Sequence, residues 1–254
     1  AYKSVADAVA AGVNYFDVTP TYGNAEVRLG PALKPYRKDV FLACKSNNRT
    51  AKGTKKRLDN SLKKLKTDYF DLYQLHALKD VEEDVKASLA KGGAMEAILE
   101  AQKAGIIKHI GFSAHTPEAA IYAMENFDFD TMLYPVNFCC HYQGNFDQRA
   151  LAKAREKNVA ILTLKAMAKQ KRASRKNRPN WPKTWYEPVA DPKLAKMALE
   201  WTLSRAGAVS AIPPGDERLF RLAMDIASRL EPASDTDEKE LKRIAKDLDP
   251  IFTA

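Results

Sequence analysis

Short runs of apolar residues alternate with amphipathic stretches along this chain. Each apolar run is continuous, which is typical of parallel strands that are buried on both faces. The runs predict strands at residues 15–18, 40–45, 70–75, 109–112, 131–136, 160–164 and 209–212.

Helical periodicity fills the intervals between these strands. In residues 54–67, three leucines recur on one face while lysines occupy the other. Thr116-Pro117 and Asp191-Pro192 each have the pattern of an N-cap followed by proline at the first helical position. We therefore expect helices at residues 54–67, 93–104, 218–230 and 236–248, and after each of the two prolines.

This alternation of strands and helices predicts βα units and a parallel sheet, and hence an α/β fold. No internal repeat and no linker rich in glycine or serine interrupts the 254 residues, so we interpret residues 1–254 as a single domain. A barrel and a doubly wound sheet both fit the alternation. The motif G-x-G-x-x-G, which often follows the first strand of a doubly wound sheet, does not occur.

The chain is basic, with 41 lysines and arginines against 32 aspartates and glutamates and a formal net charge of +9. A basic surplus can serve nucleic acid, anionic membranes or phosphorylated ligands. No zinc-finger or RNA-recognition signature accompanies it, so we do not expect nucleic-acid binding. Much of this surplus of positive charge lies in residues 169–183. We interpret this segment either as a solvated loop or as a loop beside a phosphate-bearing cofactor. Its basic residues include Lys171, Arg172, Arg175, Lys176 and Arg178.

The cysteines and the lengths of the apolar runs indicate where the protein works and whether it binds a metal or a membrane. The three cysteines, Cys44, Cys139 and Cys140, are an odd number and lack the usual zinc spacing, so we expect reduced thiols, no metal site and a cytoplasmic protein. No apolar run approaches the roughly 20 residues that span a bilayer, so we expect no membrane association.

Four residues that can transfer or stabilise protons follow three successive strands. Asp17 and Tyr22 come where the first strand gives way to a turn, Lys45 ends the second strand, and His76 ends the third. Barrel enzymes place their chemistry at the carboxyl ends of strands. The pattern therefore predicts one proton-transfer site made of an acid, a phenol, an amine and an imidazole.

At these residues the sequence resembles the aldo-keto reductases. Residues 17–23 read D-V-T-P-T-Y-G, similar to the family signature D-T-A-x-x-Y-G, and residues 68–76 read D-Y-F-D-L-Y-Q-L-H, similar to its block D-x-x-D-L-x-x-x-H. The resemblance runs from the first helix to about Leu230. It implies a (β/α)8 TIM barrel and NADPH-dependent reduction of the carbonyl group of a small aldehyde or ketone.

The same resemblance assigns roles to the four residues. Tyr22 would be the general acid that protonates the carbonyl oxygen, and Lys45 would make that proton easier to release because a positive charge favours the phenolate. Asp17 would keep Lys45 charged and in place. His76 would orient the carbonyl through a hydrogen bond.

The residues implied for cofactor binding are Ser113, Lys165, Pro214, Gly215, Arg221 and Asp225. Ser113 matches the serine that holds the nicotinamide amide, but Ala114 replaces the asparagine that usually follows it. Arg221 matches a basic residue that meets the 2′-phosphate, which favours NADPH over NADH because an arginine fork suits phosphate geometry. Aromatic residues Trp181, Trp185 and Tyr186 follow the seventh predicted strand and form either a lid or an anchor for their loop.

Family members begin with a hairpin and a first barrel strand before the first helix, and this sequence starts within that helix. We therefore expect the native protein to be longer at its N-terminus. Two other functions stay open at this point. One is a nucleotide-sensing regulatory subunit on the same fold with little or no turnover. The other is a lyase that forms a Schiff base through Lys45, which needs an amine with a lowered pKa.

Overall fold

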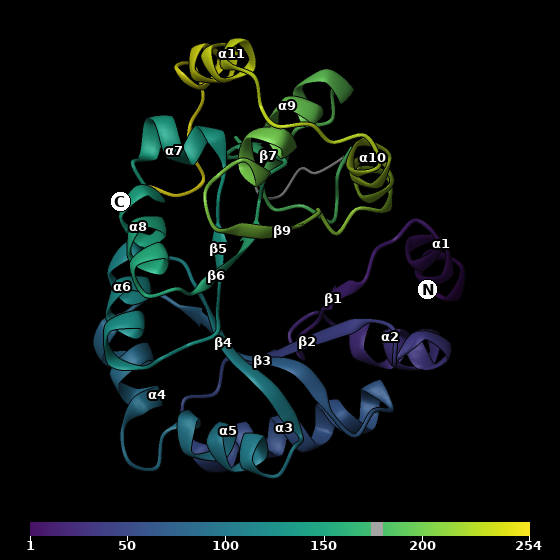
Figure 1. The fold of residues 1–254 in the computed structure, drawn as a ribbon, viewed down its shortest axis with the longest axis vertical. Coiled ribbons are helices and arrows are strands. Elements are labelled where there is room, and N and C mark those ends of the chain that lie inside the picture. The colour runs from purple at the N-terminus through teal and green to yellow at the C-terminus, as the bar shows by residue number, and fades with distance from the viewer. Residues whose placement is uncertain (174–179) are drawn as a thin grey trace. The chain divides into compact units, whose positions relative to one another are not determined.

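A computed structural model of the chain describes residues 1–173 and 180–254. Strands and helices alternate as the sequence predicts (Figure 1). In chain order the elements are α1 (Tyr2–Ala10), β1 (Tyr15–Asp17), α2 (Ala25–Leu33), η1 (Lys34–Tyr36), β2 (Phe41–Ser46), α3 (Ala51–Leu65), β3 (Phe70–Leu78), η2 (Val81–Lys86), α4 (Ala87–Leu89), α5 (Ala94–Lys103), β4 (Ile107–Ala114), α6 (Pro117–Asn126), β5 (Thr131–Pro135), α7 (Phe138–Gly144), α8 (Gln148–Glu156), β6 (Ala160–Leu164), β7 (Ala168–Gln170), β8 (Glu187–Pro188), α9 (Pro192–Leu203), β9 (Ala208–Ile212), α10 (Glu217–Ala227) and α11 (Asp235–Ala245).

The chain divides into two compact units. Unit 1 comprises residues 1–114 and 118–132, and unit 2 comprises residues 115–117 and 133–254. The interpretation of residues 1–254 as a single domain stays a prediction.

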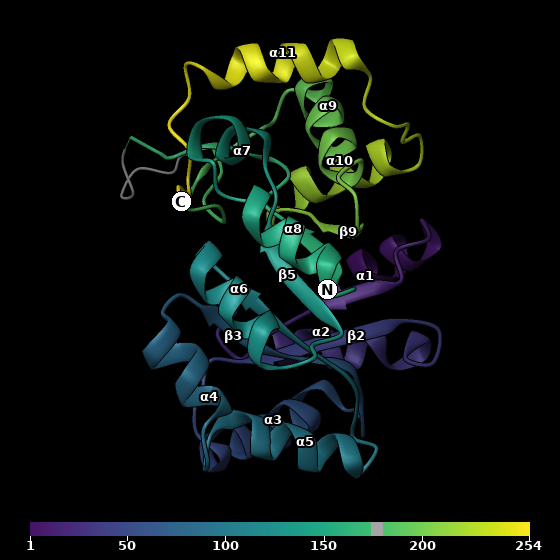
Figure 2. The same cartoon turned by 60° about the vertical axis from the view of Figure 1, so that its left-hand side comes forward.

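Unit 1 is built on parallel strands in the order β1-β2-β3-β4. Strands β2 and β3 are buried along most of their length, as their continuous apolar runs predict. Helix α3 packs on β2 and α5 packs on β4, and the two helices lie side by side in a second view (Figure 2). Because parallel strands end at the same edge, the segments after β1, β2 and β3 are neighbours.

Unit 2 pairs β6 with β9 in parallel and β7 with β8 in antiparallel fashion. The backbone N–H of Val136, just past β5, donates to the carbonyl of Leu164 at the end of β6. Helix α9 buries Trp201 completely, and α11 packs on both α7 and α9.

Helix α3 begins earlier than the sequence predicts. The expected start was Thr54, but the Thr50 hydroxyl accepts a hydrogen bond from the backbone N–H of Gly53 at 3.2 Å, which makes Thr50 the N-cap and Ala51 the first helical residue. The cap predicted at Asp191 is confirmed, since its carboxylate accepts a hydrogen bond from the backbone N–H of Leu194 at 2.8 Å.

Several elements escaped the sequence analysis, namely α2, α7, α8 and the β7–β8 pair. Helix α2 contains Gly30 and Pro31, two residues that normally argue against a helix. Gly30 is required by packing, because a Cβ there would lie 2.6 Å from the Cα and carbonyl carbon of Leu65 in α3. The close approach of α2 to α3 thus depends on the absence of a side chain.

All helices of the described residues are too short or too polar to cross a membrane. All three cysteines are free and buried. Burial raises the pKa of each thiol from 9.0 to about 12. Free thiols agree with the sequence expectation.

Gly30→Ala should destabilise the protein by about 1–3 kcal/mol, because the added methyl group overlaps backbone atoms that cannot move aside cheaply. Urea unfolding measures this change. Val27→Ala, at an exposed position of the same helix, should alter stability by less than about 0.5 kcal/mol. Equal effects of the two substitutions would contradict the packing argument.

At pH 8 the native thiols should react with iodoacetamide about a thousandfold more slowly than free cysteine, because raising the pKa from 9.0 to about 12 removes three orders of magnitude of thiolate. Intact mass should show almost no label on the folded protein and labelling of all three cysteines in urea. Rapid modification of one cysteine in the folded protein would contradict the burial described above.

Candidate active site

An ion pair between Asp17 and Lys45 lies at the centre of the predicted site. The Lys45 Nζ donates to the Asp17 Oδ2, and the two side chains are only 2% and 5% exposed. Burial opposes the charge on Lys45, but the attraction of Asp17 and Tyr22 outweighs it and raises the pKa of Lys45 above 10.5. The ammonium therefore stays charged at neutral pH in spite of its burial.

Tyr22 lies in the turn after β1 and is 51% exposed, so a small molecule can reach it. The Lys45 Nζ is 5.2 Å from the centre of the Tyr22 ring. The His76 imidazole approaches the same ring edge-on, with 6.3 Å between ring centres and an interplanar angle of 86°. The four predicted residues Asp17, Tyr22, Lys45 and His76 thus meet in one place within unit 1.

Local hydrogen bonds set the turn that carries Tyr22. The backbone N–H of Tyr22 donates to the carbonyl of Thr19 at 3.0 Å. The buried Thr19 hydroxyl in turn donates to the carbonyl of Lys45 at 3.1 Å. The turn and the end of β2 are therefore tied together through Thr19.

Gln74 is a site residue that the sequence analysis missed. It lies on β3 opposite Lys45 in the strand ladder and is fully buried. Its Nε2 donates to the Asp17 Oδ1 at 3.2 Å, so Asp17 is held from two sides. The sequence feature that could have identified Gln74 is a polar amide within a buried apolar strand. It lies two residues before His76, a spacing that puts both side chains on the same face of a regular strand.

Ser113, expected to contact the nicotinamide, is buried near the end of β4 in unit 1. Its hydroxyl accepts a hydrogen bond from the backbone N–H of Ala77 at 2.7 Å. Ala77 directly follows His76. A hydroxyl that accepts one hydrogen bond still has its own proton to donate.

The other predicted cofactor residues belong to unit 2. Lys165 has a left-handed backbone with φ of 69°, and its Nζ lies 5.7 Å from the Trp185 ring centre and 5.2 Å from that of Tyr186. Tyr186 is buried, and Trp185 contacts both Tyr186 and Phe252 edge-on. These ring contacts favour the anchor over the lid for the aromatic loop.

Pro214 is buried while Gly215 is exposed, just before α10. A side chain added at Gly215 would meet no atom within 4 Å, so this backbone is open to a ligand. Arg221 pairs with Glu217 at 2.9 Å on the exposed face of α10. Asp225 pairs at 2.5 Å with Arg229, which lies just past the end of α10. Exposed pairs of this kind are worth little and can be exchanged for a ligand contact.

Arg218 is a second cation near this loop that the sequence analysis passed over. It contacts the Asp216 carboxylate at 3.0 Å, and its guanidinium lies 4.2 Å from the centre of the Trp181 ring. A cavity of about 570 Å³ in unit 2 is lined by Trp181 together with Lys169, Arg172 and Glu187. The predicted cofactor residues of unit 2 are not among the residues that line it.

The basic segment is only partly described. Lys171 pairs with Asp249 at 3.1 Å, and Arg172 donates to the carbonyl of Tyr186 at 2.8 Å. Both cations are therefore engaged within unit 2. The remaining basic residues of that prediction, Arg175, Lys176 and Arg178, lie outside the described residues. In residues 1–173 and 180–254, no group of three or more His, Cys, Asp or Glu side chains could hold a metal ion.

Asp17→Asn and Lys45→Met should each cost about 3–5 kcal/mol of stability, because either change leaves one buried charge without its partner. The double variant should lose less stability than the sum of the two single losses.

The stability that the ion pair adds should also depend on pH. Since the pKa of Lys45 is raised above 10.5, this stabilisation is fully present below pH 10.5 and is lost as the pH rises through the higher folded-state pKa. Urea unfolding of the four proteins at pH 7 and pH 11 measures both effects, and additive losses would contradict the pairing.

The sequence is similar to those of known oxidoreductases. A sequence model described as the Aldo/keto reductase family matches residues 1–244. The uncharacterized oxidoreductase YqkF of Bacillus subtilis is 33% identical over 125 residues, which cover 44% of this chain and 39% of YqkF. The matched part thus spans less than half the length of that relative.

Solved structures extend the likeness in fold. The holo form of aldo-keto reductase AKR11C1 from Bacillus halodurans aligns with a TM-score of 0.73 and 17% identity over 96% of this chain and 86% of its own. The Bombyx mori aldo-keto reductase AKR2E4, solved in complex with NADP, aligns with a TM-score of 0.70 and 16% identity over 96% and 82% of the two chains. This likeness confirms the (β/α)8 fold class expected from the sequence. With the family match over residues 1–244, it establishes that the chain belongs to the aldo/keto reductase family.

Proposed function

We propose that this chain reduces the carbonyl group of a small aldehyde or ketone to an alcohol, with NADPH as the reductant. The observation that carries the proposal is the meeting of Tyr22, Lys45 and His76 beside the buried Asp17. Family membership supports oxidoreductase chemistry of this class. The substrate, NADPH as the particular cofactor and a cytoplasmic location are parts of the proposal.

The residues at hand fit a nicotinamide dinucleotide. Gly215 exposes backbone at the start of α10, and Arg221 offers an exposed guanidinium one turn into that helix. We propose Lys165, Pro214 and Asp225 as further cofactor contacts within unit 2. Within unit 1, the Ser113 hydroxyl has a proton left to donate to an amide. When bound, NADPH supplies the hydride that adds to the carbonyl carbon.

Proton transfer is the part of the reaction that this chain's own residues perform. The Tyr22 hydroxyl donates its proton to the carbonyl oxygen as that oxygen gains negative charge. The Lys45 ammonium stabilises the phenolate that remains, because a positive charge buried nearby is poorly screened. Asp17 keeps that ammonium in place, and Gln74 holds the free oxygen of Asp17. His76 orients the carbonyl for both transfers.

The charge of Lys45 disfavours the Schiff-base alternative. An amine attacks a carbonyl only in its neutral form, and here the attraction of Asp17 and Tyr22 outweighs burial and raises the pKa of Lys45. Borohydride treatment with an aldehyde should therefore attach no substrate to Lys45.

Tyr22→Phe should lower kcat by about 10²–10⁴-fold, because it removes a positioned general acid. NADPH oxidation with 4-nitrobenzaldehyde and methylglyoxal, followed by absorbance, measures the loss. The affinity for NADPH, followed by protein fluorescence, should stay within about twofold of the original because the phenol is assigned only to the proton.

Tyr2→Phe is the matched control, since it makes the same chemical change at an exposed tyrosine in α1. It should leave kcat unchanged. If the unmodified protein binds NADPH tightly but turns over no aldehyde or ketone, the reductase proposal is wrong and the nucleotide-sensing subunit takes its place.

A further inference from the structure

Strand β3 is irregular at the point where it carries His76. Leu75 lies opposite Phe112 and Leu78 lies opposite Ala114, so three steps along β3 face two steps along β4. The extra residue makes a β-bulge, and Ala77 within it has a φ of 58°. A residue with a Cβ avoids this left-handed conformation unless its surroundings hold it there. Bulges beside active sites serve to aim a side chain.

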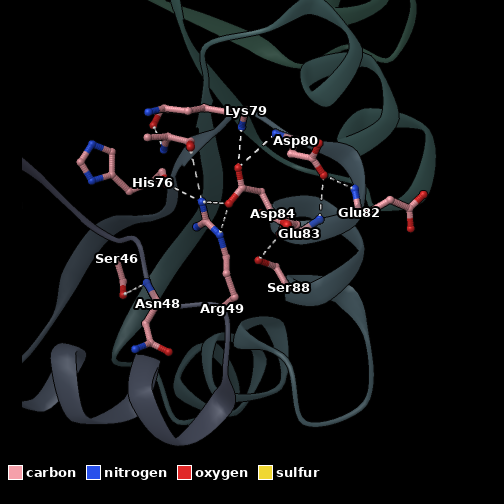
Figure 3. Close-up of polar contacts among 12 residues, drawn as sticks. Ser46, Asn48, Arg49, His76, Lys79, Asp80, Glu82, Glu83, Asp84 and Ser88 are labelled. Carbon is pink, nitrogen blue, oxygen red and sulfur yellow. Dashed lines mark hydrogen bonds and ion pairs between the residues drawn. The ribbon is translucent and has the colours of Figure 1, made fainter.

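Polar contacts of Arg49 and Ser113 hold this bulge in place, and Figure 3 shows those of Arg49. The Arg49 Nη2 donates to the carbonyl of His76 at 2.9 Å and to that of Ala77 at 3.4 Å. From the other side, the N–H of Ala77 donates to the Ser113 hydroxyl at 2.7 Å. The peptide groups on both sides of Ala77 are therefore fixed by residues that follow β2 or belong to β4.

Asp84 braces the guanidinium that makes these contacts. The Arg49 Nε donates to the Asp84 Oδ1 at 2.9 Å, and the Asp84 Oδ2 accepts from the backbone N–H groups of Lys79 at 2.7 Å and Asp80 at 3.1 Å. Burial opposes the charge on Asp84, but these N–H groups and Arg49 outweigh it and lower the pKa of the carboxyl. The carboxylate stays charged and ties the segment after β3 to Arg49.

We propose that Arg49, braced by Asp84, is a positioning residue that aims the His76 imidazole at Tyr22 by holding the bulge. The imidazole points away from the guanidinium, so Arg49 acts through the backbone of His76 (Figure 3). The inference rests on the proposed carbonyl reduction, in which His76 orients the substrate. It adds a residue outside the proton-transfer group itself.

Arg49→Met tests the proposal by removing the donors while keeping much of the side-chain volume. It should lower kcat for 4-nitrobenzaldehyde by about 10- to 100-fold, because a displacement of about 1 Å in a catalytic group can cost that much. The affinity for NADPH should change by less than about threefold, since Arg49 is assigned to the His76 bulge and not to the cofactor. Arg49→Lys should not restore the rate, because an ammonium lacks the fork that reaches Asp84 and two carbonyls together.

Arg37 offers a matched control at the opposite end of β3. Its guanidinium likewise bridges a carboxylate, that of Asp71 at 2.9 Å, and a backbone carbonyl, that of Tyr69 at 2.9 Å. Arg37→Met should therefore lower stability as Arg49→Met does, yet leave kcat within about twofold, because it lies at the far end of the strand from His76. Equal losses of kcat in the two variants would show a general effect of destabilisation and would overturn the proposal.

A second substitution separates positioning from general damage. Ala77→Gly placed in the Arg49→Met protein should recover about tenfold in kcat, because glycine adopts a positive φ without help. Failure of glycine to recover any rate would contradict the role assigned to the bulge.

The position of the His76 ring can also be followed by NMR, which needs no catalytic turnover and therefore tests the role of Arg49 separately from the proposed reduction. In a spectrum of ¹⁵N-labelled histidine, the ring signals of His76, identified by their loss in His76→Gln, should shift in Arg49→Met because the ring moves relative to Tyr22. They should not shift in Arg37→Met. An unmoved His76 signal in Arg49→Met would overturn the positioning role even in an active enzyme. If the unmodified protein has no turnover, the same shift would still report on the bulge.

Discussion

The buried ion pair of Asp17 and Lys45 is the constraint on which the rest of the site depends. Two charges that are almost wholly shielded from water are tolerated only when each satisfies the other. The pair fixes the ends of β1 and β2 relative to each other and leaves a positive charge beneath the Tyr22 ring. Gln74 and Thr19 complete this arrangement by binding the second oxygen of Asp17 and the carbonyl of Lys45.

A second set of contacts holds the backbone that carries the His76 imidazole. The end of β3 departs from regular pairing, and the departure is held by Arg49 and Ser113 rather than by the strand ladder. Regular strand geometry brings Lys45 and Gln74 opposite each other, while an irregularity presents His76. The same sheet thus carries the buried ion pair at the ends of regularly paired strands and His76 at an irregular one.

Several residues that the resemblance assigns to the cofactor already make contacts within the protein. Ser113, which the resemblance assigns to the nicotinamide, accepts a hydrogen bond from the backbone N–H of Ala77, the residue after His76. Lys165 lies against Trp185 and Tyr186, and Arg221 already has a partner in Glu217. The exposed ion pairs at α10 contribute little to stability, so a ligand contact can replace them at small cost.

The sequence by itself determined the position of each strand of the main sheet, because buried parallel strands require continuous apolar runs. It also placed Asp17, Tyr22, Lys45 and His76 at or just after the ends of those strands. It did not reveal α2, where Gly30 and Pro31 argue against a helix that packing on α3 nevertheless requires. Nor did it reveal the contacts of Gln74 and Arg49. Those contacts join residues that are distant along the chain, and only the register of neighbouring strands and one bulge bring them together.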